Sequence, residues 1–154
     1  MPAAKPGDSV ATTGRTLEIV RVLHAPRDLV FDAWMDPEHR RHWWGPMGFT
    51  LPFVTIDPVP GGTWRSHMRS PEGRDYWLGG EFREIARPER IVFTFTWDDT
   101  PDNEMVVTLT FAEHAQGTEL TLRQAAFQSD DDRDSHRVGW SQSLDRLAAH
   151  LSTS

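Results

Sequence analysis

The sequence contains no cysteine, which excludes disulfide bonds, thiolate metal sites and a cysteine nucleophile. No apolar run approaches the roughly 20 residues of a membrane-spanning helix, and residues 1–14 lack the layout of a signal peptide. Basic residues form no cluster, and the net charge is −7 with both signs spread along the chain. We therefore expect a cytoplasmic protein that binds neither nucleic acid nor a membrane.

Tyrosine is nearly absent, whereas other large aromatic residues are plentiful. The 154 residues include one tyrosine but seven tryptophans and eight phenylalanines. Such rings fill the core of a protein and also line ligand cavities. The length predicts one domain with a core of its own. Residues 1–14 are rich in small and polar residues without periodicity, so we predict a disordered leader there and a single domain over residues 15–154.

A β-hairpin is predicted from residue 61 to about residue 85. Gly61-Gly62 permits a sharp corner at its start, and Pro71-Glu72-Gly73 has the composition of a turn. Apolar residues alternate with charged ones along both arms, which is the pattern of strands with one buried face. The residues expected on that face are Trp64, Ser66, Met68, Tyr76, Leu78, Gly80 and Phe82.

The remaining elements follow from the same periodicities. Strands are predicted over residues 16–24, 49–59, 90–97, 105–111 and 119–123, with Pro52 placing the second of these at an edge or a bulge. Two short helices are predicted after the first strand, and a long helix over residues 129–151. Successive strands joined by short turns imply an antiparallel sheet, and a single long amphipathic helix implies that it packs across the apolar face. The fold class is therefore α+β.

A series of motifs in this order resembles a known family. The motifs are Ala25-Pro26-Arg27, Asp36-Pro37-Glu38, Trp43-Trp44-Gly45-Pro46, Gly61-Gly62-Thr63-Trp64-Arg65, Gly80-Glu81-Phe82-Arg83-Glu84-Ile85, Pro88-Glu89-Arg90-Ile91 and Gly139-Trp140. They are similar to those of the bacterial family related to the activator of Hsp90 ATPase, within the START/Bet v 1-like (SRPBCC) superfamily. The resemblance extends from about Thr16 to Leu151.

The resemblance implies a helix-grip fold. In that fold a curved antiparallel sheet of about six to seven strands wraps around the C-terminal helix, with a cavity between them. Relatives in the superfamily include carriers of hydrophobic ligands and polyketide cyclases, so we expect a protein that binds a small apolar or aromatic molecule. The alternatives are a cyclase- or hydrolase-like enzyme that uses the same cavity, and a chaperone-related interaction module. A homodimer and a chaperone partner are left open.

The candidate ligand-binding residues are mostly aromatic and apolar side chains expected to face the space between sheet and helix. They are Trp43, Trp44, Phe49, Trp64, Ser66, Met68, Tyr76, Leu78, Phe82, Phe93, Phe95, Trp97, Leu109, Phe111, Trp140 and Leu144. The competing interpretation is that most of them are ordinary core. Trp140 lies near the start of the last helix, where we expect the cavity to open.

A catalytic carboxylate is a second interpretation of the polar residues on the strands. Asp57 is the best candidate, because it ends an apolar strand beside Gly61-Gly62. Glu81 and Glu84 are further carboxylates, although lone charges on strands are more often exposed. The hydroxyl of Ser66 could orient a ligand, but the sequence shows no base beside it for a nucleophilic role.

Two of the seven histidines, His39 and His42, have the i, i+3 spacing of metal ligands. Arg40 and Arg41 stand between them, and two cations would repel a metal ion. The other histidines are scattered, and we expect each to be solvated: His24, His67, His114, His136 and His150. We therefore predict no metal and no cofactor, with a small hydrophobic ligand as the partner.

Overall fold

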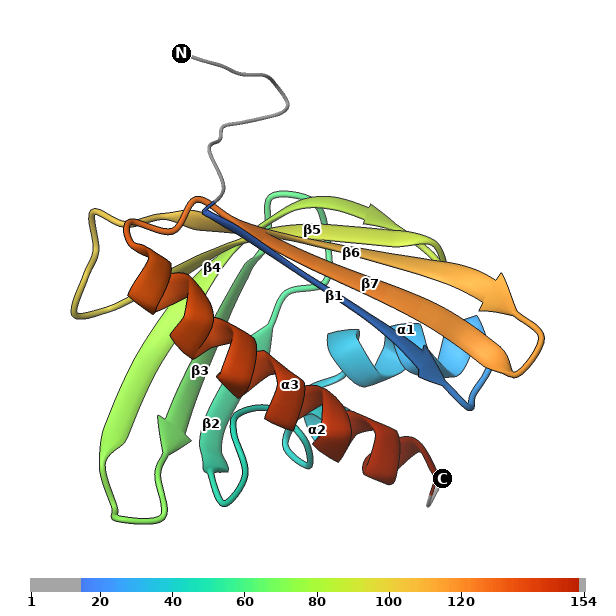
Figure 1. Ribbon diagram of the computed structural model, residues 1–154, viewed down its shortest axis with the longest axis horizontal. Helices are drawn as coiled ribbons and strands as arrows, with labels where there is room; N and C mark the ends of the chain where they lie inside the picture. Colours follow the sequence, from blue (N-terminus) through green and yellow to red (C-terminus); the bar gives the residue numbers. More distant parts are fainter. Residues whose placement is uncertain (1–14, 153–154) are drawn as a thin grey trace.

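The computed structural model describes residues 15–152, so the predicted leader 1–14 lies outside the described range. An α+β fold is formed in which one long helix crosses one face of a curved sheet (Figure 1). In chain order the elements are β1 (Thr16–Leu23), α1 (Arg27–Met35), α2 (Pro37–Arg40), β2 (Thr50–Ile56), β3 (Thr63–Arg69), β4 (Asp75–Ala86), β5 (Arg90–Trp97), β6 (Met105–His114), β7 (Gly117–Ala125) and α3 (Asp130–Ser152).

The described strands form one seven-stranded sheet in the order β1-β7-β6-β5-β4-β3-β2. Each neighbouring pair is antiparallel, and successive strands from β2 to β7 lie next to one another. β2 is an edge strand, and its register with β3 shifts between Thr50 and Phe53, which is where Pro52 lies. Pro52 therefore lies both in an edge strand and at a bulge, the two positions that the sequence predicted as alternatives. This topology confirms the helix-grip fold.

The core lies between the concave face of the sheet and the helices. Alternate residues of β5, among them Ile91, Phe93 and Phe95, are buried there, as the period of two predicts. The helix α3 buries a stripe of Trp140, Ser143, Leu144, Leu147 and Leu151 against them. No helix within residues 15–152 is both long and apolar enough to cross a membrane.

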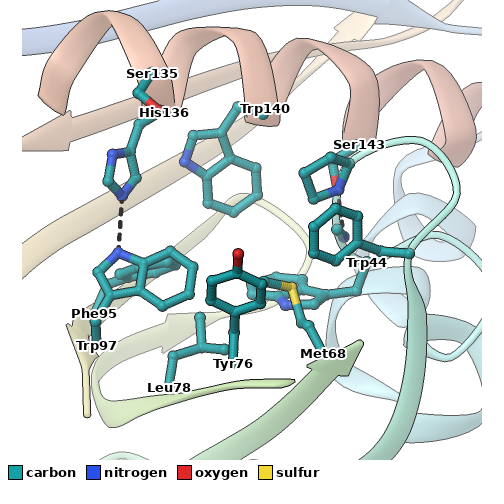
Figure 2. Close-up of a pocket in the computed structure, with 14 residues that line it drawn as sticks. Trp44, Met68, Tyr76, Leu78, Phe95, Trp97, Ser135, His136, Trp140 and Ser143 are labelled. Carbon is teal, nitrogen blue, oxygen red and sulfur yellow. Dashed lines mark hydrogen bonds between the residues drawn. The ribbon is translucent and has the colours of Figure 1, made fainter. Parts of the chain in front are cut away.

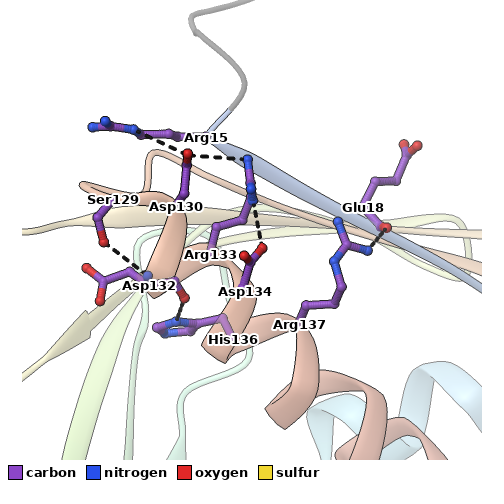
Figure 3. Close-up of polar contacts among 9 residues, drawn as sticks. All are labelled: Arg15, Glu18, Ser129, Asp130, Asp132, Arg133, Asp134, His136 and Arg137. Atoms are coloured by element: carbon purple, nitrogen blue, oxygen red, sulfur yellow. Dashed lines mark hydrogen bonds and ion pairs between the residues drawn. The ribbon is translucent and has the colours of Figure 1, made fainter.

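Local interactions determine where α2 and α3 begin. The side chain of Asp36 accepts a hydrogen bond of 2.9 Å from the amide of Glu38 at the start of α2. At the start of α3 the hydroxyl of Ser129 accepts one of 3.0 Å from the amide of Asp132 (Figure 3). The acidic residues that follow Ser129 are favoured there by the helix dipole.

Arginine side chains connect α3 with β1. Arg137 donates a hydrogen bond of 3.4 Å to the carbonyl oxygen of Glu18, and Arg15 lies 3.8 Å from the carboxylate of Asp130 (Figure 3). Because Arg15 and Asp130 are largely exposed, their ion pair contributes little stability, and buried apolar contacts hold α3 on the sheet.

Gly80 in β4 lies against β5 too closely for any other residue. A Cβ atom on Gly80 would overlap the carbonyl oxygen of Thr94 and lie 2.6 Å from its carbonyl carbon. We expect Gly80→Ala to lower the free energy of unfolding by about 3 kcal/mol, as overpacking does. The exposed neighbour Glu81 supplies a control, since Glu81→Ala should change the free energy of unfolding by less than about 0.5 kcal/mol. Urea denaturation compares the two, and a Gly80→Ala protein as stable as wild type would contradict this assignment.

Candidate ligand-binding site

A cavity of about 260 Å³ lies between the N-terminal half of α3, the strands β3 to β5 and the loop that precedes β2 (Figure 2). Its wall is mostly aromatic and apolar. The lining residues are Trp44, Gly45, Pro46, Phe49, Met68, Tyr76, Leu78, Phe95, Trp97, Ser135, His136, Gly139, Trp140 and Ser143.

The sheet supplies one side of the cavity. Met68 of β3, Leu78 of β4 and Phe95 of β5 are buried at inward positions of three neighbouring strands. Tyr76 and Trp97 are partly buried at the same end, with their ring centroids 6.3 Å apart. The hydroxyl of Tyr76 points into the cavity (Figure 2). The sheet therefore gives the cavity an apolar surface, with the hydroxyl of Tyr76 as a polar group directed into the cavity.

The loop after α2 is held against α3 by hydrogen bonds. The hydroxyl of Ser143 accepts a bond of 2.9 Å from the amide of Gly45 and donates one of 3.2 Å to the carbonyl oxygen of Trp43. The guanidinium of Arg146 donates to the carbonyl oxygens of Gly45 and Pro46, at 3.0 Å each. These contacts place Trp44 and Pro46 at the wall of the cavity.

His136 forms the other end of the cavity and joins α3 to β5. The indole N–H of Trp97 donates a bond of 3.0 Å to Nε2 of His136, so Nε2 carries no proton (Figure 2). The carbonyl oxygen of Asp132 can only accept, so Nδ1–H of His136 donates to it at 2.8 Å (Figure 3). The imidazole is therefore neutral, and burial lowers its pKa. The expectation that His136 is solvated is wrong.

Trp140 belongs both to the core and to the wall of the cavity. Its indole N–H donates a hydrogen bond of 2.7 Å to Oε1 of the buried Gln124. Its ring lies 5.4 Å from that of Trp44 and 5.8 Å from that of Trp34, measured between centroids. Trp140 is therefore held in one orientation from both sides.

A family model matches this chain over residues 24–152, under the description activator of Hsp90 ATPase homolog 1-like protein. The chain belongs to this family. A solved protein from Chromobacterium violaceum is 30% identical, with a TM-score of 0.81 over 88% of this chain and 96% of its own. An AHSA1 protein from Silicibacter pomeroyi is 28% identical, with a TM-score of 0.81 over 90% and 98%. No curated protein matches the chain.

A third structure, from Nitrosomonas europaea, shares only the fold. It is 23% identical, with a TM-score of 0.80 over 92% of this chain and 97% of its own. The family is part of the SRPBCC/Bet v 1-like superfamily, as the resemblance of the motifs predicted.

The structure separates the predicted binding residues of this chain into two groups. Those that line the cavity are Trp44, Phe49, Met68, Tyr76, Leu78, Phe95, Trp97 and Trp140. Those buried elsewhere in the core are Trp43, Trp64, Ser66, Phe82, Phe93, Leu109, Phe111 and Leu144. The second group packs within the protein, as when Phe111 meets Phe31 of α1 at 5.7 Å between centroids. Ligand contact by the first group stays a prediction.

Sequence reasoning missed the small and polar parts of the wall. These are Gly45, Pro46, Ser135, His136, Gly139 and Ser143. Two signals could have found them. Gly45 and Pro46 follow Trp44 directly, and His136 and Ser143 lie one helical turn before and after Trp140, so they share its face of α3.

The carboxylates considered for catalysis lie outside the cavity wall of this family member. Asp57, Glu81 and Glu84 are exposed, and no lining residue is acidic. Among these three, Glu84 accepts a hydrogen bond of 3.0 Å from Arg90. The cavity wall formed by the described residues therefore contains no carboxylate that could exchange a proton with a bound molecule.

His150, near the C-terminal end of α3, meets His39 and His42, which are distant from it in the sequence. His39 Nδ1 lies 2.9 Å from His150 Nε2, and the ring of His42 stacks on His150 at 5.1 Å. Burial and the neighbouring His39 and His42 lower the pKa of His150, which is partly buried. Within residues 15–152 no group of three or more histidine or acidic residues could hold a metal ion.

The pKa of His136 predicts how stability depends on pH. Burial lowers this pKa below the ordinary 6.5, so the unfolded chain binds more protons than the folded chain below about pH 6.5. The free energy of unfolding should therefore decrease as the pH falls. We expect His136→Gln, which does not titrate, to lose less stability than wild type between neutral pH and about pH 5. Denaturation at a series of pH values tests this, and equal losses would contradict it.

Proposed function

We propose that this protein binds a small apolar or aromatic molecule in the cavity between α3 and the sheet. The observation that carries the proposal is a cavity of about 260 Å³ with a mostly aromatic wall. A cavity of about 150 Å³ holds benzene, and sites for larger ligands begin near about 300 Å³. The volume therefore favours a molecule of one or two rings.

The polar groups of the wall support binding by shape and apolar contact. His136 uses both ring nitrogens within the protein, and Ser143 uses its hydroxyl as donor and as acceptor. The hydroxyl of Tyr76 points into the cavity, where it can form a hydrogen bond with a polar group of the ligand (Figure 2).

The same observations favour a binding protein over a cyclase or a hydrolase. The cavity wall contains no carboxylate, and its imidazole is already engaged through both nitrogens. An interaction module would be favoured by a filled interior, whereas this interior has room for a ligand. A chaperone partner, a homodimer and a cytoplasmic location stay predictions.

Gly139 offers a way to fill the cavity without removing any contact. It lines the cavity on α3, and a Cβ atom there would meet Cγ of Pro46 at an ordinary 3.8 Å. We expect Gly139→Phe to occupy the cavity and weaken binding of the uncharged two-ring probe 2-naphthol about tenfold or more, equivalent to roughly 1.4 kcal/mol. Fluorescence titration of the probe measures the change.

The matched control is Gly139→Ala. It should retain probe binding, and it should stabilise the protein by up to about 1 kcal/mol, because glycine disfavours a helix interior. Thermal denaturation checks that both variants are folded. Unchanged probe binding to a folded Gly139→Phe protein would contradict the proposed site.

A further inference from the structure

The interior of this protein holds a charged group that forms no ion pair with any residue in the range 15–152. Arg40 of α2 is fully buried, and its Nε donates a hydrogen bond of 2.7 Å to the carbonyl oxygen of Trp34. Its Nη1 and Nη2 have no hydrogen-bond partner among the described residues. Burial lowers its pKa to about 9, so the guanidinium is still charged at neutral pH.

Aromatic rings surround this guanidinium. Its Cζ lies 4.4 Å from the ring centroid of Trp44, 5.4 Å from that of Trp64 and 6.0 Å from that of Phe93. The faces of these rings stabilise a positive charge. They provide no oxygen acceptor for the N–H groups of Nη1 and Nη2, which form the end of the guanidinium that binds a carboxylate in a bidentate manner.

Other buried donors nearby share this lack of an acceptor. Within residues 15–152, the buried side-chain atoms without a partner are Nε1 of Trp34, Nη1 and Nη2 of Arg40, and Oγ of Ser66. Each of them can donate a hydrogen bond. A buried donor without an acceptor is costly, so an interior with this excess of donors favours a ligand that brings acceptors and negative charge.

These donors lie next to the cavity. Trp44 stacks on Arg40 and also lines the cavity, so one indole ring connects the two. The ring of Trp34 lies 6.2 Å from that of Trp44. Ser66 occupies the inward position of β3 next to that of Met68, which lines the cavity.

We propose that the ligand carries a carboxylate on its apolar or aromatic body, and that Arg40 binds this carboxylate when the indole of Trp44 moves aside. The proposal rests on the proposed function, because it concerns the chemical class of the ligand in the same cavity. A carboxylate accepts hydrogen bonds and donates none, so it complements the guanidinium and the hydroxyl of Ser66. The aromatic wall of the cavity then holds the apolar part of the ligand.

Two probes of the same shape test the proposal. They are 2-naphthoate and its uncharged analogue 2-naphthamide, titrated into the full chain by calorimetry at neutral pH. We expect wild type to bind the naphthoate about tenfold or more tightly than the amide, because a charge-assisted bidentate pair is stronger than a neutral contact. Arg40→Met should remove this preference, so that the two probes then bind with about equal affinity. Arg40→Lys keeps the charge without the bidentate geometry and should retain only part of the preference.

The control variant is Arg83→Met, which removes the same charge from an exposed arginine of β4. It should keep the full preference for the naphthoate. Equal affinity of wild type for both probes would overturn the assignment of a carboxylate and leave the proposed function standing. An equal loss in Arg83→Met would also overturn it, because net charge would then explain the preference. Binding of neither probe to wild type would contradict the proposed function as well. If a variant fails to fold, the affinities of wild type for the naphthoate and the amide still test the proposal.

Discussion

The packing of one helix against a wide concave sheet is the constraint on which the rest of this structure depends. A helix with its side chains is about 10 Å across, whereas strands lie about 4.8 Å apart, so α3 cannot cover all seven described strands. On one side α1 fills the gap, since it contacts β6, β7 and α3. On the other side the loop before β2 closes over the sheet only partly, and the cavity is the space that remains.

Tryptophan side chains form the boundary between the core and this cavity. The ring of Trp44 contacts those of Trp34, Trp43, Trp64 and Trp140, with centroids 5.4 to 6.2 Å apart. Its other neighbours are the guanidinium of Arg40 and the cavity itself. Trp44 comes from the loop after α2, so this boundary depends on the hydrogen bonds that hold that loop against α3.

Membership of the activator of Hsp90 ATPase homolog 1-like family specifies the fold of this chain more closely than its chemistry. One fold can serve ligand carriers and enzymes alike, so the function has to be argued from side chains. Here these are an aromatic wall, an imidazole held neutral by two hydrogen bonds, and buried donors without acceptors. Together they describe a site suited to holding a molecule in place.

The sequence by itself determined the α+β class and the order of the elements, because each element has a local signal, and the resemblance of its motifs to a known family implied the helix-grip fold. Alternation along β5 and the helical spacing of Trp140, Leu144 and Leu147 predicted which side chains are buried. Pro52 marked an edge strand with a bulge, and Asp36 marked the start of α2. Periodicity reports only whether a side chain points inward, so it could not separate Phe95 at the cavity from Phe93 in the core.

Only the tertiary structure decided which inward side chains meet empty space and which polar groups are left without partners. His136 looks like any surface histidine until α3 brings it to Trp97, and Arg40 reads as a solvated charge beside Arg41. The burial of both depends on how the sheet curves around α3, which is a property of contacts between residues distant in the chain. No pattern in a short stretch of sequence contains that information.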